Sequence, residues 1–135
     1  MSLITWEDKL KVGVSIIDSD HQQLVKMLNE LFDAMKARRG NDVLGKLFDD
    51  LVGYTVKHFG NEERLMQQHG YPESPEHKKQ HEELKRQAVE LQQKFKDGSF
   101  SVSIETLNFL KSWLSGHILG TDKQLAGFLI AKGVK

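Results

Sequence analysis

Residues 77–95 of the chain, HKKQHEELKRQAVELQQKF, decide the fold because one spacing runs through the whole stretch. Steps of three or four residues connect His77, His81, Leu84, Ala88, Leu91 and Phe95. Such positions share one face of an α-helix. Most other positions are charged or carry amides, so the segment predicts an amphipathic helix that turns two histidines toward a core. Ser74 and Pro75 suit its N-terminus, which gives a predicted helix at about 75–96.

The same period recurs in three other segments, which predict helices at about 19–39, 41–66 and 102–131. Their apolar lines are Leu24, Leu28, Leu31 and Met35, then Leu44, Leu47, Leu51 and Tyr54, then Leu107, Leu110 and Leu114. Short connections between helices of this length make consecutive helices antiparallel. The sequence therefore predicts a single all-α domain over 1–135, an antiparallel up-down-up-down four-helix bundle with an extended N-terminal arm over residues 1–18.

Capping residues predict where these helices begin and end. Ser19 with Gln22 three residues later predicts a capping box at the start of the first helix. The basic pair before Gly40 predicts its end, with that glycine in the left-handed conformation, and Asn41 predicts the next N-cap. A loop is predicted over 69–76, from its breakers Gly70, Pro72 and Pro75.

Charge and composition narrow the function classes. Lys+Arg and Asp+Glu both number 19, so the chain offers no excess positive charge to attract nucleic acid or an anionic membrane. No basic region followed by an apolar stretch marks a signal peptide, and we expect a cytoplasmic protein. The chain has no cysteine, so nitrogen and oxygen ligands would have to hold any metal ion.

Seven polar residues continue the apolar lines or lie beside them. They are His21, His58, Glu62, His77, His81, His117 and Asp122. A buried carboxylate without a partner costs several kcal/mol, and no lysine or arginine lies on the apolar lines near these positions. Five imidazoles and two carboxylates are too many ligands for one ordinary metal ion. They suit two neighbouring metal ions bridged by the carboxylates.

Each element of this pattern has a simpler explanation when it is taken alone. A single core histidine such as His21 is more often a hydrogen-bonded packing residue than a ligand. A histidine four residues before a glutamate, as in His58 and Glu62, is common on solvated helix faces. The metal interpretation rests on the joint pattern, in which these elements accompany the apolar residues of the predicted core.

His117 and Asp122 depart from regular helical spacing. They are five residues apart, which corresponds to about 140° around an ideal α-helix. Gly116 and Gly120 bracket this turn and would ease a local distortion. We therefore predict a single-turn π-bulge across 117–122, because such bulges are frequent at functional sites.

Four motifs of the chain resemble those of the hemerythrin family, in particular its single-domain bacterial members. They are Asp18-Ser-Asp-His21, His58-Phe-Gly-Asn-Glu62-Glu63, His77-Lys-Lys-Gln-His81 and Trp113-Leu-Ser-Gly-His117-Ile-Leu-Gly-Thr-Asp122-Lys123. The resemblance covers essentially the whole chain and includes all seven ligand positions of the family. It implies a non-haem pair of iron ions, Fe2+ or Fe3+, with an oxo or hydroxo bridge.

The resemblance also implies an asymmetric centre. One iron would have three histidine ligands and be coordinatively full, whereas the other would have two and keep one position open for dioxygen. The three-histidine iron would take His77, His81 and His117, the other iron His21 and His58, and the bridges would be Glu62 and Asp122.

A dry apolar pocket would have to surround the open position, because water and protons would otherwise leave the iron oxidised. The residues that we expect to line it are Phe59, Trp113, Ile118 and Leu28. Two positions depart from the family pattern. Gly120 stands where a larger apolar residue is frequent, and Leu125 stands where a tyrosine is frequent. The glycine would open a solvent path and speed autoxidation.

The function that the resemblance implies is reversible dioxygen binding, for oxygen storage or for delivery to oxygen-requiring enzymes, and not catalysis. A monomer is expected, with dioxygen as ligand and an oxygen-using enzyme as recipient. The alternatives are an oxygen or redox sensor acting through a separate partner, a di-iron enzyme reducing peroxide or NO, and a zinc-stabilised structural bundle. Di-iron oxygenase sites are rich in carboxylates, so this histidine-rich set favours binding over activation.

Overall fold

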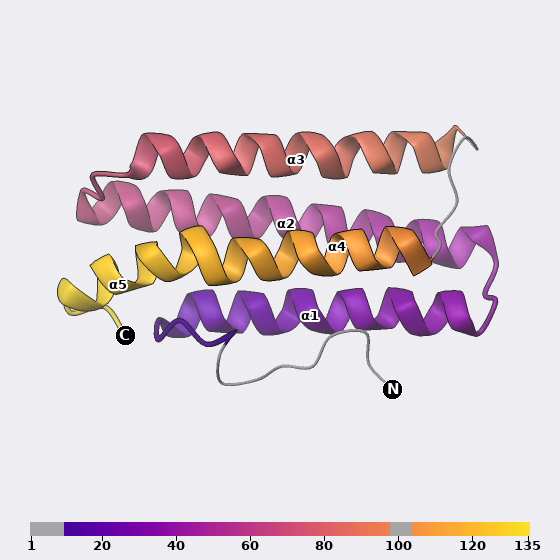
Figure 1. Ribbon diagram of the computed structural model, residues 1–135, viewed down its shortest axis with the longest axis horizontal. Coiled ribbons are helices and arrows are strands. Elements are labelled where there is room, and N and C mark those ends of the chain that lie inside the picture. Colours follow the sequence, from indigo (N-terminus) through magenta and orange to yellow (C-terminus); the bar gives the residue numbers. More distant parts are fainter. Residues whose placement is uncertain (1–9, 98–103) are drawn as a thin grey trace.

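Four antiparallel helical rods lie side by side in the computed structural model, which describes residues 10–97 and 104–135 (Figure 1). The first three are α1 (Ser15–Lys36), α2 (Asn41–His69) and α3 (Ser74–Lys96). The last is built from α4 (Ile104–His117), the π-helical segment η2 (Ile118–Asp122) and α5 (Lys123–Ala131). α1 packs against α2 and α4, and α2 packs against α3. The predicted all-α, up-down-up-down four-helix bundle is confirmed.

The apolar lines of the helices meet in the interior of the bundle. Most of their predicted members are buried, namely Leu24, Leu28, Leu31, Leu44, Leu51, Ala88, Leu107, Leu110 and Leu114. Met35, Leu47, Tyr54, Leu91 and Phe95 are half-buried against this core, and Leu84 is half-buried. None of the helices in the described ranges is long and apolar enough to cross a membrane.

The first helix begins earlier than the sequence predicts. α1 starts at Ser15, so the predicted start at Ser19 and the arm over residues 1–18 are wrong for its last four residues. The Asp18 carboxylate accepts hydrogen bonds from the backbone N–H groups of Val12 and Gly13, at 2.8 and 3.1 Å. Ile17 is buried in the core. These contacts stabilise the extra first turn, and the predicted capping box at Ser19 does not start the helix. Residues 1–9 of the predicted arm lie outside the described ranges.

The first helix also ends before the predicted residue 39. Its last residue is Lys36, and Arg38 adopts the left-handed conformation at φ 56°. The N–H groups of Arg38 and Arg39 donate to the carbonyls of Met35 and Ala34, the pattern of a Schellman cap. Gly40 instead has φ −65° and is the N-cap of α2. The left-handed cap of the first helix therefore lies at Arg38, two residues before the predicted Gly40, and the N-cap of the second helix lies one residue before the predicted Asn41.

The second helix runs to His69 and not to residue 66. Gly70 ends it in the left-handed conformation at φ 65°, and the Tyr71 N–H donates to the Met66 carbonyl at 3.0 Å. Gly70, predicted as a helix breaker in the loop, is therefore the C-terminal cap of α2. His69 is a half-buried helical residue and not a loop residue. α3 begins at Ser74, one residue before the predicted start.

Candidate metal centre

All seven predicted ligand residues converge at one place inside the bundle, and none is more than 7% exposed. Each of the four helical rods contributes at least one of them. α1 supplies His21, α2 supplies His58 and Glu62, α3 supplies His77 and His81, α4 ends with His117, and η2 ends with Asp122.

The π-helical segment η2 brings the last two residues together. In a regular α-helix, side chains five residues apart would point about 140° away from each other. Here the backbone of 118–122 is π-helical, and Asp122 Oδ1 lies 2.9 Å from His117 Nε2. The predicted π-bulge is confirmed, and it is the local distortion that lets both side chains face the interior.

Ligand atoms of these residues form two overlapping groups, and within each group the atoms lie within 4.8 Å of one another. One group has three histidines and the other has two, while both carboxylates belong to both groups. The first comprises Glu62, His77, His81, His117 and Asp122, and the second comprises His21, His58, Glu62 and Asp122. This is the arrangement that two neighbouring metal ions with shared carboxylates require.

Asp122 divides its two oxygens between the two groups. Its Oδ2 lies 2.7 Å from His21 Nε2 and 3.6 Å from His58 Nε2. Its Oδ1 lies 2.9 Å from His117 Nε2 and 3.2 Å from His77 Nε2. A carboxylate whose oxygens face different histidine groups has the geometry of a bridging ligand.

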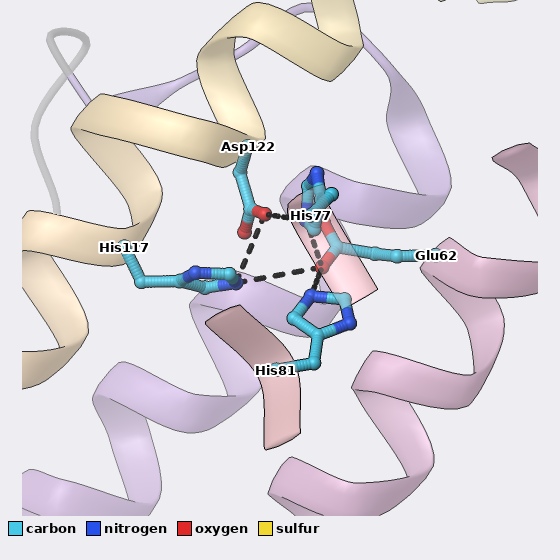
Figure 2. Close-up of side chains that lie close together, drawn as sticks. All are labelled: Glu62, His77, His81, His117 and Asp122. Atoms are coloured by element: carbon cyan, nitrogen blue, oxygen red, sulfur yellow. Dashed lines mark hydrogen bonds and ion pairs between the residues drawn. The ribbon is translucent and has the colours of Figure 1, made fainter. Parts of the chain in front are cut away.

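Glu62 uses one oxygen for both groups. Figure 2 shows its carboxylate among the imidazoles of α3 and α4. Glu62 Oε1 lies 3.0 Å from His81 Nε2 and 3.5 Å from His117 Nε2, and it lies 3.4 Å from His58 Nε2 on its own helix. Its Oε2 is buried and has no hydrogen-bond partner among the described residues. That oxygen is free to bind a cation.

The electrostatics of the centre favour positive charge. Burial opposes the charged form of His58, but the nearby carboxylate of Asp122, the hydrogen bond to Asp20 and the charge of Glu62 outweigh it and raise its pKa to about 10. Burial is likewise overcome at His117, whose pKa the same two ligand carboxylates raise to about 9. Burial and the charge of Asp122 would raise the pKa of Glu62, yet the imidazoles of His117, His77 and His81 around its carboxylate lower it to about 2. The charge of His117 and the histidines around Asp122 likewise outweigh its burial and hold its pKa well below the ordinary value, so both carboxylates are ionised near neutral pH.

Unpartnered buried atoms test whether a metal ion fits here. Glu62 Oε2, Asp122 Oδ1, His77 Nε2 and His117 Nε2 are buried and make no hydrogen bond of normal geometry within the described part of the chain, although Asp122 Oδ1 and His117 Nε2 lie 2.9 Å apart. Buried polar atoms without a partner are rare in native proteins. Each of these atoms can give a lone pair to a metal ion, and the imidazole and carboxylate donors suit divalent first-row metals. The donor set therefore fits a pair of metal ions.

Three further residues contact the outer nitrogens of the histidines, and the sequence interpretation missed them. Asp20 Oδ2 lies 2.9 Å from His58 Nδ1, and Glu63 Oε2 lies 3.1 Å from His81 Nδ1. The Thr121 hydroxyl lies 3.1 Å from His117 Nδ1. Asp20 and Glu63 are each adjacent in sequence to a predicted ligand. Consecutive residues lie about 100° apart around a helix, so neither residue is on the helix face that carries the ligand and the apolar line. Their acidic side chains beside His21 and Glu62 were the available signal.

The residues expected to line a ligand pocket are buried or half-buried inside the bundle. Phe59, Ile118 and Leu28 are buried, and Trp113 is half-buried. The Phe59 ring stacks on the His81 ring at a centroid distance of 4.0 Å and lies 5.9 Å from that of His58. Trp113 borders a half-open pocket between α3 and α4 that reaches His117, together with Gln80, Glu83, Leu84, Gln87 and Gly116. A role of these residues around dioxygen stays a prediction.

Comparison with known proteins gives one consistent result. Residues 12–129 match the family described as the hemerythrin HHE cation binding domain. A bacteriohemerythrin of Stenotrophomonas maltophilia is 36% identical over 93% of this chain and 81% of its own length. A bacteriohemerythrin of Methylococcus capsulatus is 37% identical over 91% and 94%, and a myohemerythrin of Riftia pachyptila is 33% identical over 92% of each chain. A crystal structure of wild-type hemerythrin superposes with a TM-score of 0.89 at 34% identity, covering 95% of this chain and 98% of that one.

Proposed function

This chain belongs to the hemerythrin family, and on that premise we propose that it binds dioxygen reversibly at a non-haem di-iron centre. The observation that carries the proposal is the asymmetry of the buried ligand set. Three histidines stand on one side of the shared carboxylates and two on the other. Two like metal ions would then differ in coordination, and only one would have room for a further ligand.

In this proposal the seven converging side chains are the ligands of two irons. The carboxylates of Glu62 and Asp122 would bridge the pair, and their ionised state offsets part of the positive charge that the buried metals bring. His77, His81 and His117 would fill one iron, while the space beside His21 and His58 would stay open. When bound, a pair of ferrous ions supplies two electrons to dioxygen and recovers them when dioxygen leaves.

Burial of the centre supports release of dioxygen over its further reduction. Both carboxylates and four of the five histidine ligands are at most 2% exposed, so bulk water is held away from the site. Phe59 and Ile118 add apolar surface next to the ligands, since Phe59 stacks on His81 and Ile118 directly follows His117. A dry pocket lacks the protons that would convert reduced dioxygen to free peroxide.

The ligand chemistry supports a binding protein over an enzyme. Di-iron sites in carboxylate-rich bundles use Glu-x-x-His pairs, whereas this centre has five imidazoles and two carboxylates. Neutral imidazoles stabilise ferrous iron better than additional anionic ligands would. We therefore propose oxygen storage or delivery to an oxygen-using enzyme as the physiological role, with the protein acting as a monomer in the cytoplasm.

An ultraviolet–visible experiment tests the proposal. The protein is loaded with Fe2+ without oxygen, and its spectrum is taken before air is admitted, after air, and after oxygen is removed again. We expect an absorption band that forms in air and disappears on deoxygenation over repeated cycles. A band that forms once and never reverses would contradict the proposal and favour a redox sensor or an enzyme. Protein loaded with Zn2+ serves as the control and should stay colourless.

A further inference from the structure

A buried carboxylate that no metal would touch lies behind one of the two histidines beside the open position. Asp20, on α1, is 8% exposed, and its Oδ2 lies 2.9 Å from His58 Nδ1. The other ring nitrogen of His58, Nε2, points into the centre, 3.4 Å from Glu62 Oε1 and 3.6 Å from Asp122 Oδ2. His58 therefore joins Asp20 to the metal centre.

Two more side chains donate hydrogen bonds to Asp20. The Tyr54 hydroxyl donates to Asp20 Oδ1 at 3.0 Å, and the Asn61 amide donates to Oδ2 at 3.1 Å. With His58, three donors share the two oxygens of one carboxylate. All three come from α2, so the network also ties α1 to α2 beside the centre.

The hydrogen-bond chemistry determines which nitrogen of His58 is free. An ionised carboxylate can only accept, so His58 Nδ1 must carry the proton, and the lone pair of Nε2 is left for the metal. An anionic acceptor on Nδ1–H also makes Nε2 a stronger electron donor. The other histidine of this half differs, because His21 Nδ1 is buried without a hydrogen-bond partner among the described residues.

We propose that Asp20 is a positioning residue for the two-histidine iron: it orients His58, fixes its tautomer and increases its donation to that iron. This inference rests on the proposed function for the identity of the metal, and it adds a residue that tunes the open position. Stronger donation from His58 stabilises the ferric state. Asp20 thereby favours the dioxygen-bound form, in which the iron is oxidised. It also lowers the affinity of the ferric iron for other anions.

The test replaces Asp20 by asparagine, which keeps the shape but leaves one acceptor oxygen for three donors. Anaerobic Fe2+ titration should give about 10-fold weaker iron binding, the loss typical when the outer partner of a histidine ligand is removed. The diferric form of Asp20→Asn, titrated with azide as a probe of the open position, should bind azide more tightly than wild type. A purely structural defect would weaken both.

Two further variants keep the proposal falsifiable. Tyr54→Phe removes one donor from Asp20 but leaves the carboxylate on His58, so it should bind iron as wild type does. Glu63→Gln removes the matching carboxylate from His81, on the three-histidine side, and should leave azide affinity unchanged. Wild-type iron and azide affinities in Asp20→Asn would overturn the proposal, and so would a Tyr54→Phe loss equal to that of Asp20→Asn.

The iron and azide titrations do not depend on reversible oxygen binding. If wild-type protein fails to release oxygen but Asp20→Asn shows the two expected shifts, the proposed function is wrong and the role of Asp20 stands. If wild type is reversibly oxygenated and Asp20→Asn is unchanged in both titrations, the role of Asp20 is wrong and the proposed function stands.

Discussion

Gly120 is the residue for which the sequence predicts a solvent path to the centre. It lies in η2, between His117 and Asp122, and is exposed. A Cβ atom added there would meet no heavy atom within 4 Å, so a larger side chain fits without displacing its neighbours. One and two turns earlier, Gly116 and Trp113 border the half-open pocket that reaches His117. A pocket that is open to the surface therefore reaches His117, one of the predicted ligands.

We expect Gly120→Leu to lengthen the autoxidation half-life of the oxygenated protein. The added side chain would cover the π-helical turn next to His117 and slow the entry of water and protons. The half-life is measured from the decay of the oxygen-dependent band in air. Gly127→Leu is the matched control, since Gly127 is also an exposed helical glycine with no atom within 4 Å of an added Cβ. Equal half-lives in Gly120→Leu and wild type would refute the expectation.

Among the helix ends, that of α1 places a non-glycine residue in a left-handed backbone conformation. Arg38 is exposed and is the one non-glycine residue with a positive φ in the described ranges. The Schellman cap demands this conformation, because the N–H groups of Arg38 and Arg39 both turn back to the last carbonyls of the helix. At the corresponding place after α2 and after α5 the chain has Gly70 and Gly133.

Arg38→Gly should therefore stabilise the protein by about 0.5–1 kcal/mol, since glycine reaches the left-handed region without the clash of a Cβ atom. Chemical denaturation of metal-free protein would give the change in the free energy of unfolding. Arg38→Ala removes the same charge but keeps the Cβ atom, and we expect no comparable gain from it. A gain of the same size in both variants would mean that charge, and not backbone conformation, is responsible.

At the scale of the whole molecule, the buried centre links folding to protons and to metal. In metal-free protein the pKa of His58 is about 10 and that of His117 is about 9, and both are above the ordinary histidine value of 6.5. A histidine whose pKa is higher in the folded state stabilises the fold fully below its unfolded pKa, and that contribution is lost as pH rises through the folded value. Glu62, lowered from 4.5 to about 2, contributes above 4.5 and loses its contribution as pH falls toward 2.

Metal-free protein should consequently be most stable between pH 4.5 and 6.5 and lose stability as the pH rises toward 10. Iron should reverse this trend, because coordinated imidazoles need no proton and protons compete with the metal at low pH. Urea denaturation from pH 5 to 9, with and without iron under anaerobic conditions, measures both curves. Parallel curves for the two forms would contradict this linkage.

The bundle, and the faces on which the seven predicted ligand residues lie, could be predicted from the sequence because both depend on local spacing. A period of three to four residues places Leu24, Leu28 and Leu31 on one face, and it places His77 and His81 on one face, whatever the rest of the chain does. The five-residue spacing of His117 and Asp122 also predicted the π-bulge, since no regular α-helix could bring both side chains inward.

Only the tertiary structure decided which atoms meet across helices. The contact of Asp20 with His58 joins α1 to α2 across 38 positions of sequence, and no periodicity within either helix contains it. The extra first turn of α1 likewise depends on the Asp18 carboxylate reaching back to Val12 and Gly13. Spacing along a helix determines the face on which a side chain lies, but its hydrogen-bond partner is determined by the packing of that face against another helix.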